Sequence, residues 1–430
     1  MKNLLKTTVC FTTMSLTAIL LPMNVMANEG EAKTITIAWT NIMESQQEIW
    51  EKYIFEPFEE KHPEVTIDFQ CLPDLQNTVR VQVAAGAGPD MFYMDSVDIP
   101  DYASTNRILS LENYRKEYNL DDSMYDWAIR SCLYEDEMYA LPASVEATAM
   151  TYNKNLLDQL GKDVPTNREE FVDVCNAALE AGLIPVSFGY SGANLLLTWP
   201  YEHYLTCYAG GEKTAQLLKG EITFDDPDIK GAFELLKADW DAGYINDKKS
   251  GAITNDEARI LFANQKAVFN YEGPWLILAD GAAKTWDFEW GQCAWPSMKD
   301  GTPAGSAITL GEAIGINANS QVSDLCMEMM MDFYSNEELM AQAVAEGFST
   351  PAVPIDSAAY PEDMDENIRK ALDAQNENMN LETVGYAPWG FFLDDNLDKV
   401  FYDKMDLDTF IDKANETIAE DFADGYVFAG

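Results

Sequence analysis

Hydrophobic and polar positions divide the first hundred residues into alternating strands and helices. Residues 34–40, 65–70 and 90–94 are short, β-prone and apolar or alternating, which is typical of strands. Between them, residues 46–61 and 75–85 carry apolar side chains at helical spacing. The order strand, helix, strand, helix, strand predicts a parallel, doubly wound sheet at the start of the chain.

The later part of the chain repeats these patterns with longer helical stretches. We expect strands at 145–152, 183–188, 267–271 and 288–294, whereas residues 307–316 are small and apolar with interspersed Gly. We expect helices at 155–161, 167–181, 194–209, 228–242, 254–263, 322–334, 337–345 and in the tail from 365. A chain of 430 residues exceeds one ordinary core. Since no low-complexity linker separates two units, we expect two lobes with interleaved connections.

One stretch, residues 261–278, combines a helix end, a buried strand and an abrupt turn. The strand AVFNY ends at Gly273-Pro274, because Pro cannot continue a strand ladder and Gly accepts unusual dihedrals. Trp275 therefore begins a new segment just beyond a strand end, where ligands bind in open α/β sheets. Its indole is either a packing residue or a flat platform that faces a cleft.

Composition and charge narrow the classes of partner. The chain is 47% hydrophobic and 12% aromatic, which is typical of a folded protein. Its formal net charge of -45 makes nucleic acid, anionic lipid headgroups and polyanionic substrates poor partners. Neutral and cationic ligands, including polyamines, remain open.

The N-terminus has the features of an export signal. Residues 1–27 contain Lys2 and Lys6, an apolar run and small residues before Asn28, where we expect cleavage. An uncleaved anchor is the alternative, although the apolar run is short for a membrane span. We therefore expect an exported chain, located in the periplasm or at the extracellular face of the cytoplasmic membrane.

Catalytic and metal-binding motifs are absent from the sequence. The six Cys that follow the signal show no CxxC spacing, and their pairing stays open. No HExxH, Walker loop or GxSxG is present, so we expect no cofactor, no metal and no enzyme activity. A secreted glycoside hydrolase remains an alternative, because a chain with 73 Asp and Glu can supply paired carboxylates.

Several segments, in order, resemble one protein family. They are AAGAGPD at 84–90, YALP at 139–142, EATAMTYNK at 146–154, EGPW at 272–275 and IGINA at 314–318. Together they resemble extracellular solute-binding proteins of carbohydrate ABC importers, the maltose-binding-protein-like family. The resemblance implies an α/β, two-lobed periplasmic-binding-protein-like fold, each lobe a mostly parallel sheet flanked by helices, joined by a multi-strand hinge.

The resemblance also divides the chain and assigns its partners. We expect the first lobe at 34–144 and 315–348, and the second lobe at 145–314 and 349–430. The family implies capture of an extracellular carbohydrate in the cleft between the lobes and delivery to the membrane permease subunits of an ABC importer. A monomer is expected, and a non-sugar solute such as a polyamine is a further alternative. The signal lacks the Cys of lipoprotein members, which favours a freely soluble protein.

Candidate ligand contacts follow from the resemblance and from position. Trp275, Trp389 and Glu146 match family positions, with Trp275 and Trp389 as stacking platforms. Asp95 follows the third strand, where a ligand carboxylate belongs, whereas Asp90 is expected to orient its own loop. The remaining candidates lie in loops or at lobe crossings: Asn41, Glu44, Asn194 and Glu312. Helix capping is an equal alternative for Asn41 and Glu44, and core packing is the alternative for Trp389.

Overall fold

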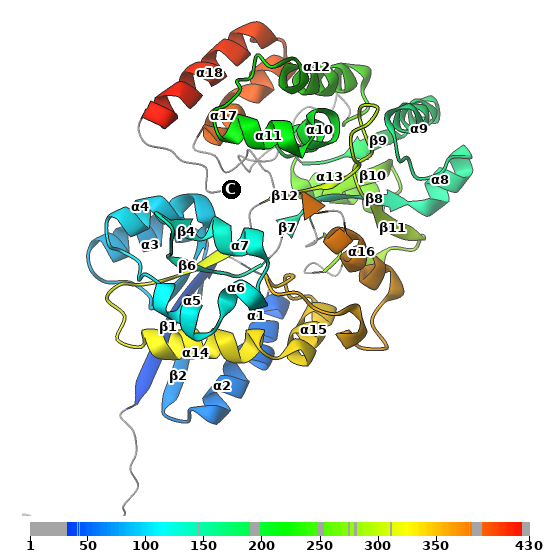
Figure 1. Cartoon of the computed structure of the whole chain (residues 1–430). Helices are drawn as coiled ribbons and strands as arrows, with labels where there is room; N and C mark the ends of the chain where they lie inside the picture. The colour runs from blue at the N-terminus through cyan, green and yellow to red at the C-terminus, as the bar shows by residue number, and fades with distance from the viewer. Residues whose placement is uncertain are drawn as a thin grey trace, which may run out of the picture.

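The computed structural model describes most of the chain after residue 31. The described residues are 32–40, 42, 44–144, 146–189, 198–246, 253–273, 276–278, 282–309, 312–377, 379–380 and 389–423. They form two lobes, each with a sheet at its centre and helices around it (Figure 1). The two-lobed α/β fold expected from the sequence is thereby confirmed.

The first lobe is built on a five-stranded sheet in the order β2-β1-β3-β13-β6. Its strands are β1 (Lys33–Thr40), β2 (Val65–Leu72), β3 (Met91–Asp95), β6 (Ala140–Pro142) and β13 (Glu312–Ile316). Its helices are α1 (Glu44–Trp50), α2 (Glu56–Lys61), α3 (Leu75–Ala84), α4 (Ile99–Ser104), α5 (Glu112–Glu117), α6 (Leu120–Ser123), α7 (Asp126–Ser131), α14 (Ser323–Tyr334) and α15 (Glu337–Glu346). A small hairpin, β4 (Leu133–Tyr134) and β5 (Glu137–Met138), lies beside them.

The second lobe is built on a four-stranded sheet in the order β11-β8-β10-β9. Its strands are β8 (Ala149–Asn153), β9 (Ile184–Ser187), β10 (Ala267–Glu272) and β11 (Trp290–Cys293). Its helices are α8 (Lys154–Leu160), α9 (Arg168–Glu180), α10 (Thr198–Tyr204), α11 (Gly211–Leu218), α12 (Pro227–Ala242), α13 (Asn255–Ala263), α16 (Glu366–Glu377), α17 (Gly390–Phe401) and α18 (Leu407–Ala423).

Short strands connect the two lobes. β7 (Glu146–Ala147) pairs antiparallel with β12 (Ser306–Thr309), and β14 (Met379–Asn380) joins β12 in parallel. Along the chain, β7 lies between β6 of the first lobe and β8 of the second, and β12 lies between β11 of the second lobe and β13 of the first. Distant parts of the chain therefore pair where it passes between the lobes (Figure 1). The multi-strand connection expected from the sequence is present, while the exact lobe boundaries stay a prediction.

The sheets are mostly parallel, as expected, but each contains one strand that runs against the others. In the first sheet, β1 runs parallel to β2 and β3, but β13 runs antiparallel to β3 and β6. In the second sheet, β10 is parallel to β9 and antiparallel to β8. Parallel neighbours need a local helical crossover, whereas a strand that arrives from the other lobe enters in either direction.

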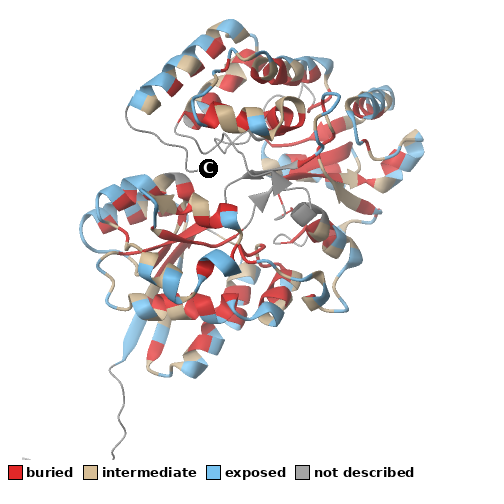
Figure 2. Ribbon diagram, viewed as in Figure 1, coloured by how far each residue is buried: buried red, intermediate tan, exposed pale blue. Residues whose placement is uncertain are grey.

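Buried apolar residues form one large cluster in each lobe, and Figure 2 marks buried positions in red in both lobes. A third cluster joins Ala341 and Val344 of α15 to Leu276 and Ile277, which follow β10, and to Leu372 of α16. All six cysteines among the described residues are free thiols. Among the described residues, no helix has both the length and the apolar character that crossing a membrane requires.

The segment that leads to Trp275 shows how sequence sets local structure. α13 begins with a capping box, in which the Thr254 Oγ1 accepts from the Glu257 backbone at 3.2 Å and Glu257 accepts from the Thr254 backbone at 2.9 Å. Gln265 then takes a left-handed conformation, with φ of 56°, that turns the chain into β10. β10 is buried along its whole length because it lies between β8 and β9.

Candidate functional site

Two carboxylates lie opposite each other at one end of the strands of the first sheet, where β3 ends and β13 begins. Asp95 is the last residue of β3 and Glu312 is the first residue of β13, and the antiparallel register places them directly opposite each other. Residues in such a pair project from the same face of the sheet, with Cβ atoms about 4.5–5.5 Å apart. The fold therefore brings together two side chains that the sequence proposes from separate arguments.

Asp95 is held by two hydrogen bonds. The Tyr93 hydroxyl donates to Oδ1 at 2.8 Å, and the Gln76 amide donates to Oδ2 at 2.6 Å. Tyr93 lies two residues before Asp95 on the strand, so both side chains share one face. Burial raises the pKa of Asp95, and these two hydrogen bonds offset part of that rise. The carboxylate is thus fixed in orientation at the strand end.

Glu312 lies in a less polar setting. The Ser144 hydroxyl donates to its Oε2 at 3.0 Å. Burial raises the pKa of Glu312 to about 7, with the Asp95 charge adding to the rise and the Ser144 hydrogen bond opposing it. Two like charges directly opposite each other are unfavourable, so one proton held at the pair relieves their repulsion. At neutral pH the pair can therefore both donate and accept hydrogen bonds.

A third carboxylate extends this acidic end of the sheet. Asp98 ends the short 3-10 turn Ser96–Asp98 that follows β3, and it accepts a hydrogen bond from Arg80 at 3.0 Å. Burial raises the pKa of Asp98, and the neighbouring charge of Asp95 adds to that effect. Among the described residues, no group of three or more His, Cys, Asp and Glu side chains is placed to hold a metal ion.

The other proposed contacts have different outcomes. Glu44 is exposed and opens α1, where a carboxylate interacts favourably with the helix N-terminus. The backbone of Glu146 lies in β7 opposite Thr309, at the crossing between lobes. Asn41, Asn194 and Trp275 lie outside the described residues, so their proposed contacts stay predictions.

The platform proposed at Trp389 needs correction. Its side chain is 1% exposed and packs edge-on against Phe224, with ring centroids 5.4 Å apart, in the apolar cluster of the second lobe. A stacking platform must offer one face of its ring to a ligand. Trp389 is therefore a core residue, as in the alternative reading, and its ring packs the start of α17 into the apolar cluster of the second lobe.

The loop role expected for Asp90 is confirmed. Its Oδ2 accepts from the backbone and the hydroxyl of Thr36 at 2.9 and 2.7 Å, and its Oδ1 accepts from the Ser320 hydroxyl at 2.8 Å. These contacts tie the loop before β3 to β1 and to the chain after β13. Asp90 thus orients the segment that carries Asp95.

Sequence reasoning missed the side chains that hold the two carboxylates, namely Tyr93, Gln76 and Ser144. Strand alternation was the available signal for Tyr93, because residues two apart on a strand share a face. Gln76 and Ser144 come from a helix and a crossing segment that are distant in sequence. Only the folded arrangement brings them to Asp95 and Glu312.

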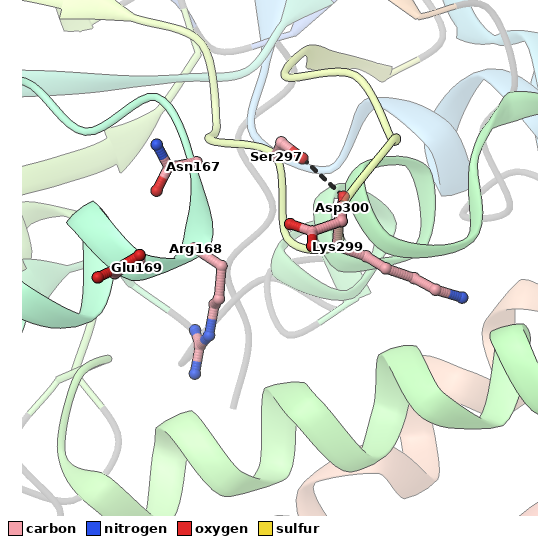
Figure 3. Close-up of a pocket in the computed structure, with 6 residues that line it drawn as sticks. All are labelled: Asn167, Arg168, Glu169, Ser297, Lys299 and Asp300. Atoms are coloured by element: carbon pink, nitrogen blue, oxygen red, sulfur yellow. Dashed lines mark hydrogen bonds between the residues drawn. The ribbon is translucent and has the colours of Figure 1, made fainter.

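A polar hollow of about 300 Å³ lies elsewhere, at the start of α9. Figure 3 shows Asn167, Arg168 and Glu169 on one side of it, and Ser297, Lys299 and Asp300 on the other. Its cations are already paired, Arg168 with Asp239 at 2.5 Å and Lys299 with Asp228 at 2.5 Å. Because it belongs to the second lobe alone, it is separate from the strand ends that carry Asp95 and Glu312.

Comparison with known proteins identifies what the chain is similar to. The profile of the family described as bacterial extracellular solute-binding protein matches residues 43–341. The multiple sugar-binding protein of Streptococcus mutans is 24% identical over 324 residues, which cover 69% of this chain and 70% of that protein. The galactooligosaccharide-binding protein of Bacillus subtilis is 25% identical over 285 residues, 64% of this chain and 63% of that protein.

Solved structures agree on the fold. A chitin oligosaccharide binding protein superposes with a TM-score of 0.77 at 19% identity, over 91% of this chain and 99% of that one. At such identity the likeness shows the two-lobed fold alone.

Proposed function

The chain belongs to the bacterial extracellular solute-binding protein family, and on that premise we propose that it captures a carbohydrate between its lobes and delivers it to an ABC importer. As a member of this family it is an exported protein. Its partners are then a mono- or oligosaccharide and the membrane permease subunits of the importer. It acts as a monomer and binds no nucleic acid, in keeping with its net charge of -45.

The observation that carries this proposal is the carboxylate pair of Asp95 and Glu312. Sugars present many hydroxyls, and a sugar site needs fixed groups that accept and donate hydrogen bonds. Asp95 is oriented by Tyr93 and Gln76 and keeps further lone pairs for ligand hydroxyls. Glu312, with its raised pKa, offers a donor or an acceptor from the facing strand.

The second lobe supplies the remaining contacts in this proposal. Trp275 stacks on the apolar face of a sugar ring, and Glu146 and Asn194 bind its hydroxyls. Asn41 and Glu44 contribute from the first lobe. A ligand that touches both lobes binds the closed state more tightly than the open one, so it shifts the equilibrium toward closure.

A thermal-shift screen tests the proposal. The panel contains maltotriose, raffinose, galactooligosaccharides and chitin oligosaccharides, each added to the purified mature chain. A ligand present at about 100 times its Kd stabilises the folded state by about 2.7 kcal/mol. At least one sugar should therefore raise the melting temperature, and a panel without any shift would contradict carbohydrate capture.

A polyamine is the second candidate ligand, because three carboxylates, Asp95, Asp98 and Glu312, lie at one end of the first sheet. Spermidine in the same screen distinguishes the two: a shift with spermidine and none with sugars would favour the cation. The carboxylate pair also motivates a glycoside hydrolase. We propose binding without catalysis, so prolonged incubation should release no shorter sugars.

A further inference from the structure

A buried chain of hydrogen bonds crosses the second lobe. The Tyr271 hydroxyl donates to Thr148 Oγ1 at 3.0 Å, and Thr148 Oγ1 lies 2.9 Å from His203 Nε2. Tyr271 is 2% exposed, and Thr148 and His203 are 0% exposed. Where water has no access, removal of one partner leaves the other polar groups unsatisfied, so the three groups are strongly constrained.

These three residues belong to the segments that carry the proposed second-lobe contacts. Thr148 separates β7 from β8, two residues after Glu146. Tyr271 lies at the end of β10, four residues before Trp275, and the register that pairs Glu272 with Ala149 brings this end beside Thr148. His203 lies in α10, the helix that follows the segment with Asn194.

The histidine ring is held by two aromatic side chains. Its ring stacks on Trp295, with centroids 5.3 Å apart and planes at 20°, and meets the edge of Tyr271 at 4.9 Å. Burial lowers the pKa of His203 to about 3, so the ring is neutral at physiological pH. Tyr271 donates its proton to Thr148, and the Thr148 hydroxyl in turn lies within hydrogen-bond distance of His203 Nε2.

The end of β10 is also held from its other face. Glu272 follows Tyr271 in the strand, so their side chains point to opposite faces of the sheet. Arg259 of α13 binds Glu272 through Nε, at 2.9 Å from Oε1 and 3.1 Å from Oε2. Both faces of the strand end are therefore clamped immediately before Gly273.

We propose that Tyr271, Thr148 and His203 are positioning residues, which set carbohydrate affinity by fixing the ends of β7 and β10 without touching the ligand. This inference rests on the proposed function. A general role in stability would affect the whole second lobe. A positioning role instead predicts faster local opening at the ends of β7 and β10, together with weaker binding.

Hydrogen exchange followed by mass spectrometry tests it on the full mature chain. Thr148→Val keeps the side-chain shape and removes the hydroxyl, whereas Thr148→Ser keeps the hydroxyl. Tyr204→Phe is the matched control. It also removes a buried hydroxyl, that of Tyr204 in α10, which donates to Asp239 at 2.7 Å and lies outside the network. In Thr148→Val, amides of 146–150 and 270–273 should exchange about tenfold faster than in wild type. Thr148→Ser and Tyr204→Phe should stay within about threefold of wild type there.

The binding measurement uses the panel sugar that gives the largest shift with wild type. Thr148→Val should raise its Kd about tenfold, while Thr148→Ser and Tyr204→Phe change it by less than about threefold. Equal effects of Thr148→Val and Tyr204→Phe in both measurements, or an unchanged Kd in folded Thr148→Val, would overturn the proposal. If Thr148→Val fails to fold, Tyr271→Phe replaces it with the same expected outcomes. If no sugar binds wild type, the proposed function fails, and the exchange data still decide whether the network fixes the strand ends.

Discussion

Replacement of Glu312 by Gln should change how the free energy of unfolding depends on pH. The pKa of Glu312 is raised from its ordinary value of 4.5 to about 7, chiefly by burial. Between these two pH values the folded state holds a proton that the unfolded state has released. Stability must therefore fall as pH rises through this window, and it levels off above pH of about 7.

The size of this effect follows from the shift. Each pKa unit corresponds to about 1.36 kcal/mol, so a change from 4.5 to about 7 amounts to about 3 kcal/mol. Glu312 keeps partial contact with solvent, which screens the interaction and brings the expected loss to about 2–3 kcal/mol. Gln cannot ionise, and it still accepts from Ser144. The variant should thus lack this loss and be the more stable protein above pH of about 7.

Urea denaturation of wild type and Glu312→Gln is measured from pH 5 to pH 8 without ligand. The difference between the two unfolding free energies then gives the pH-dependent contribution of Glu312. Glu170→Gln is a control whose difference from wild type should stay flat over this range, because hydrogen bonds from the Thr166 backbone and hydroxyl lower the pKa of Glu170 below its ordinary value of 4.5. A difference between wild type and Glu312→Gln that is flat with pH, or that grows in favour of wild type, would refute the account of the carboxylate pair.

Four further outcomes are expected. Trp275→Ala should weaken sugar binding about tenfold or more by calorimetry, with little loss of stability in the absence of ligand. Trp389→Ala should instead lose about 3–5 kcal/mol of stability in urea, since its ring is 1% exposed in the core. If Trp275→Ala lost stability and Trp389→Ala lost affinity, Trp275 would be the core residue and Trp389 the ligand platform. Arg259→Ala should cost about 3–5 kcal/mol because it removes the guanidinium that pairs with the buried Glu272 carboxylate, and Glu272→Gln in the same chain should recover part of that loss. Saturating sugar should reduce the radius of gyration in X-ray scattering, and an unchanged value would argue against hinge closure.

Local pattern accounts for most of the elements. Helices such as α12 and strands such as β10 lie within a few residues of their expected positions, because apolar spacing and Gly-Pro boundaries act over short distances. Strand direction is different. The hydrophobic pattern of β13 carries no information that this strand returns from the other lobe and runs antiparallel to β3. The mixed sheets therefore could not be predicted from the hydrophobic pattern.

The candidate site divides in the same way. Asp95 could be proposed because a strand end is a local feature, but its pairing with Glu312 depends on contact between residues that are far apart in sequence. Trp389 shows the opposite limit. A Trp after Ala-Pro near the C-terminus has the same local sequence on a surface as in a core, and only packing against Phe224 decides between them.

The most direct test of carbohydrate capture at this site is isothermal titration of wild type and Asp95→Asn with the sugar that gives the largest thermal shift. Saturable binding to wild type is expected, with a Kd about tenfold or more higher for the variant, a loss of about 1.4 kcal/mol or more, because an acceptor oxygen held by Tyr93 and Gln76 is lost. Equal affinities in the two proteins would contradict the assignment of Asp95 to the ligand.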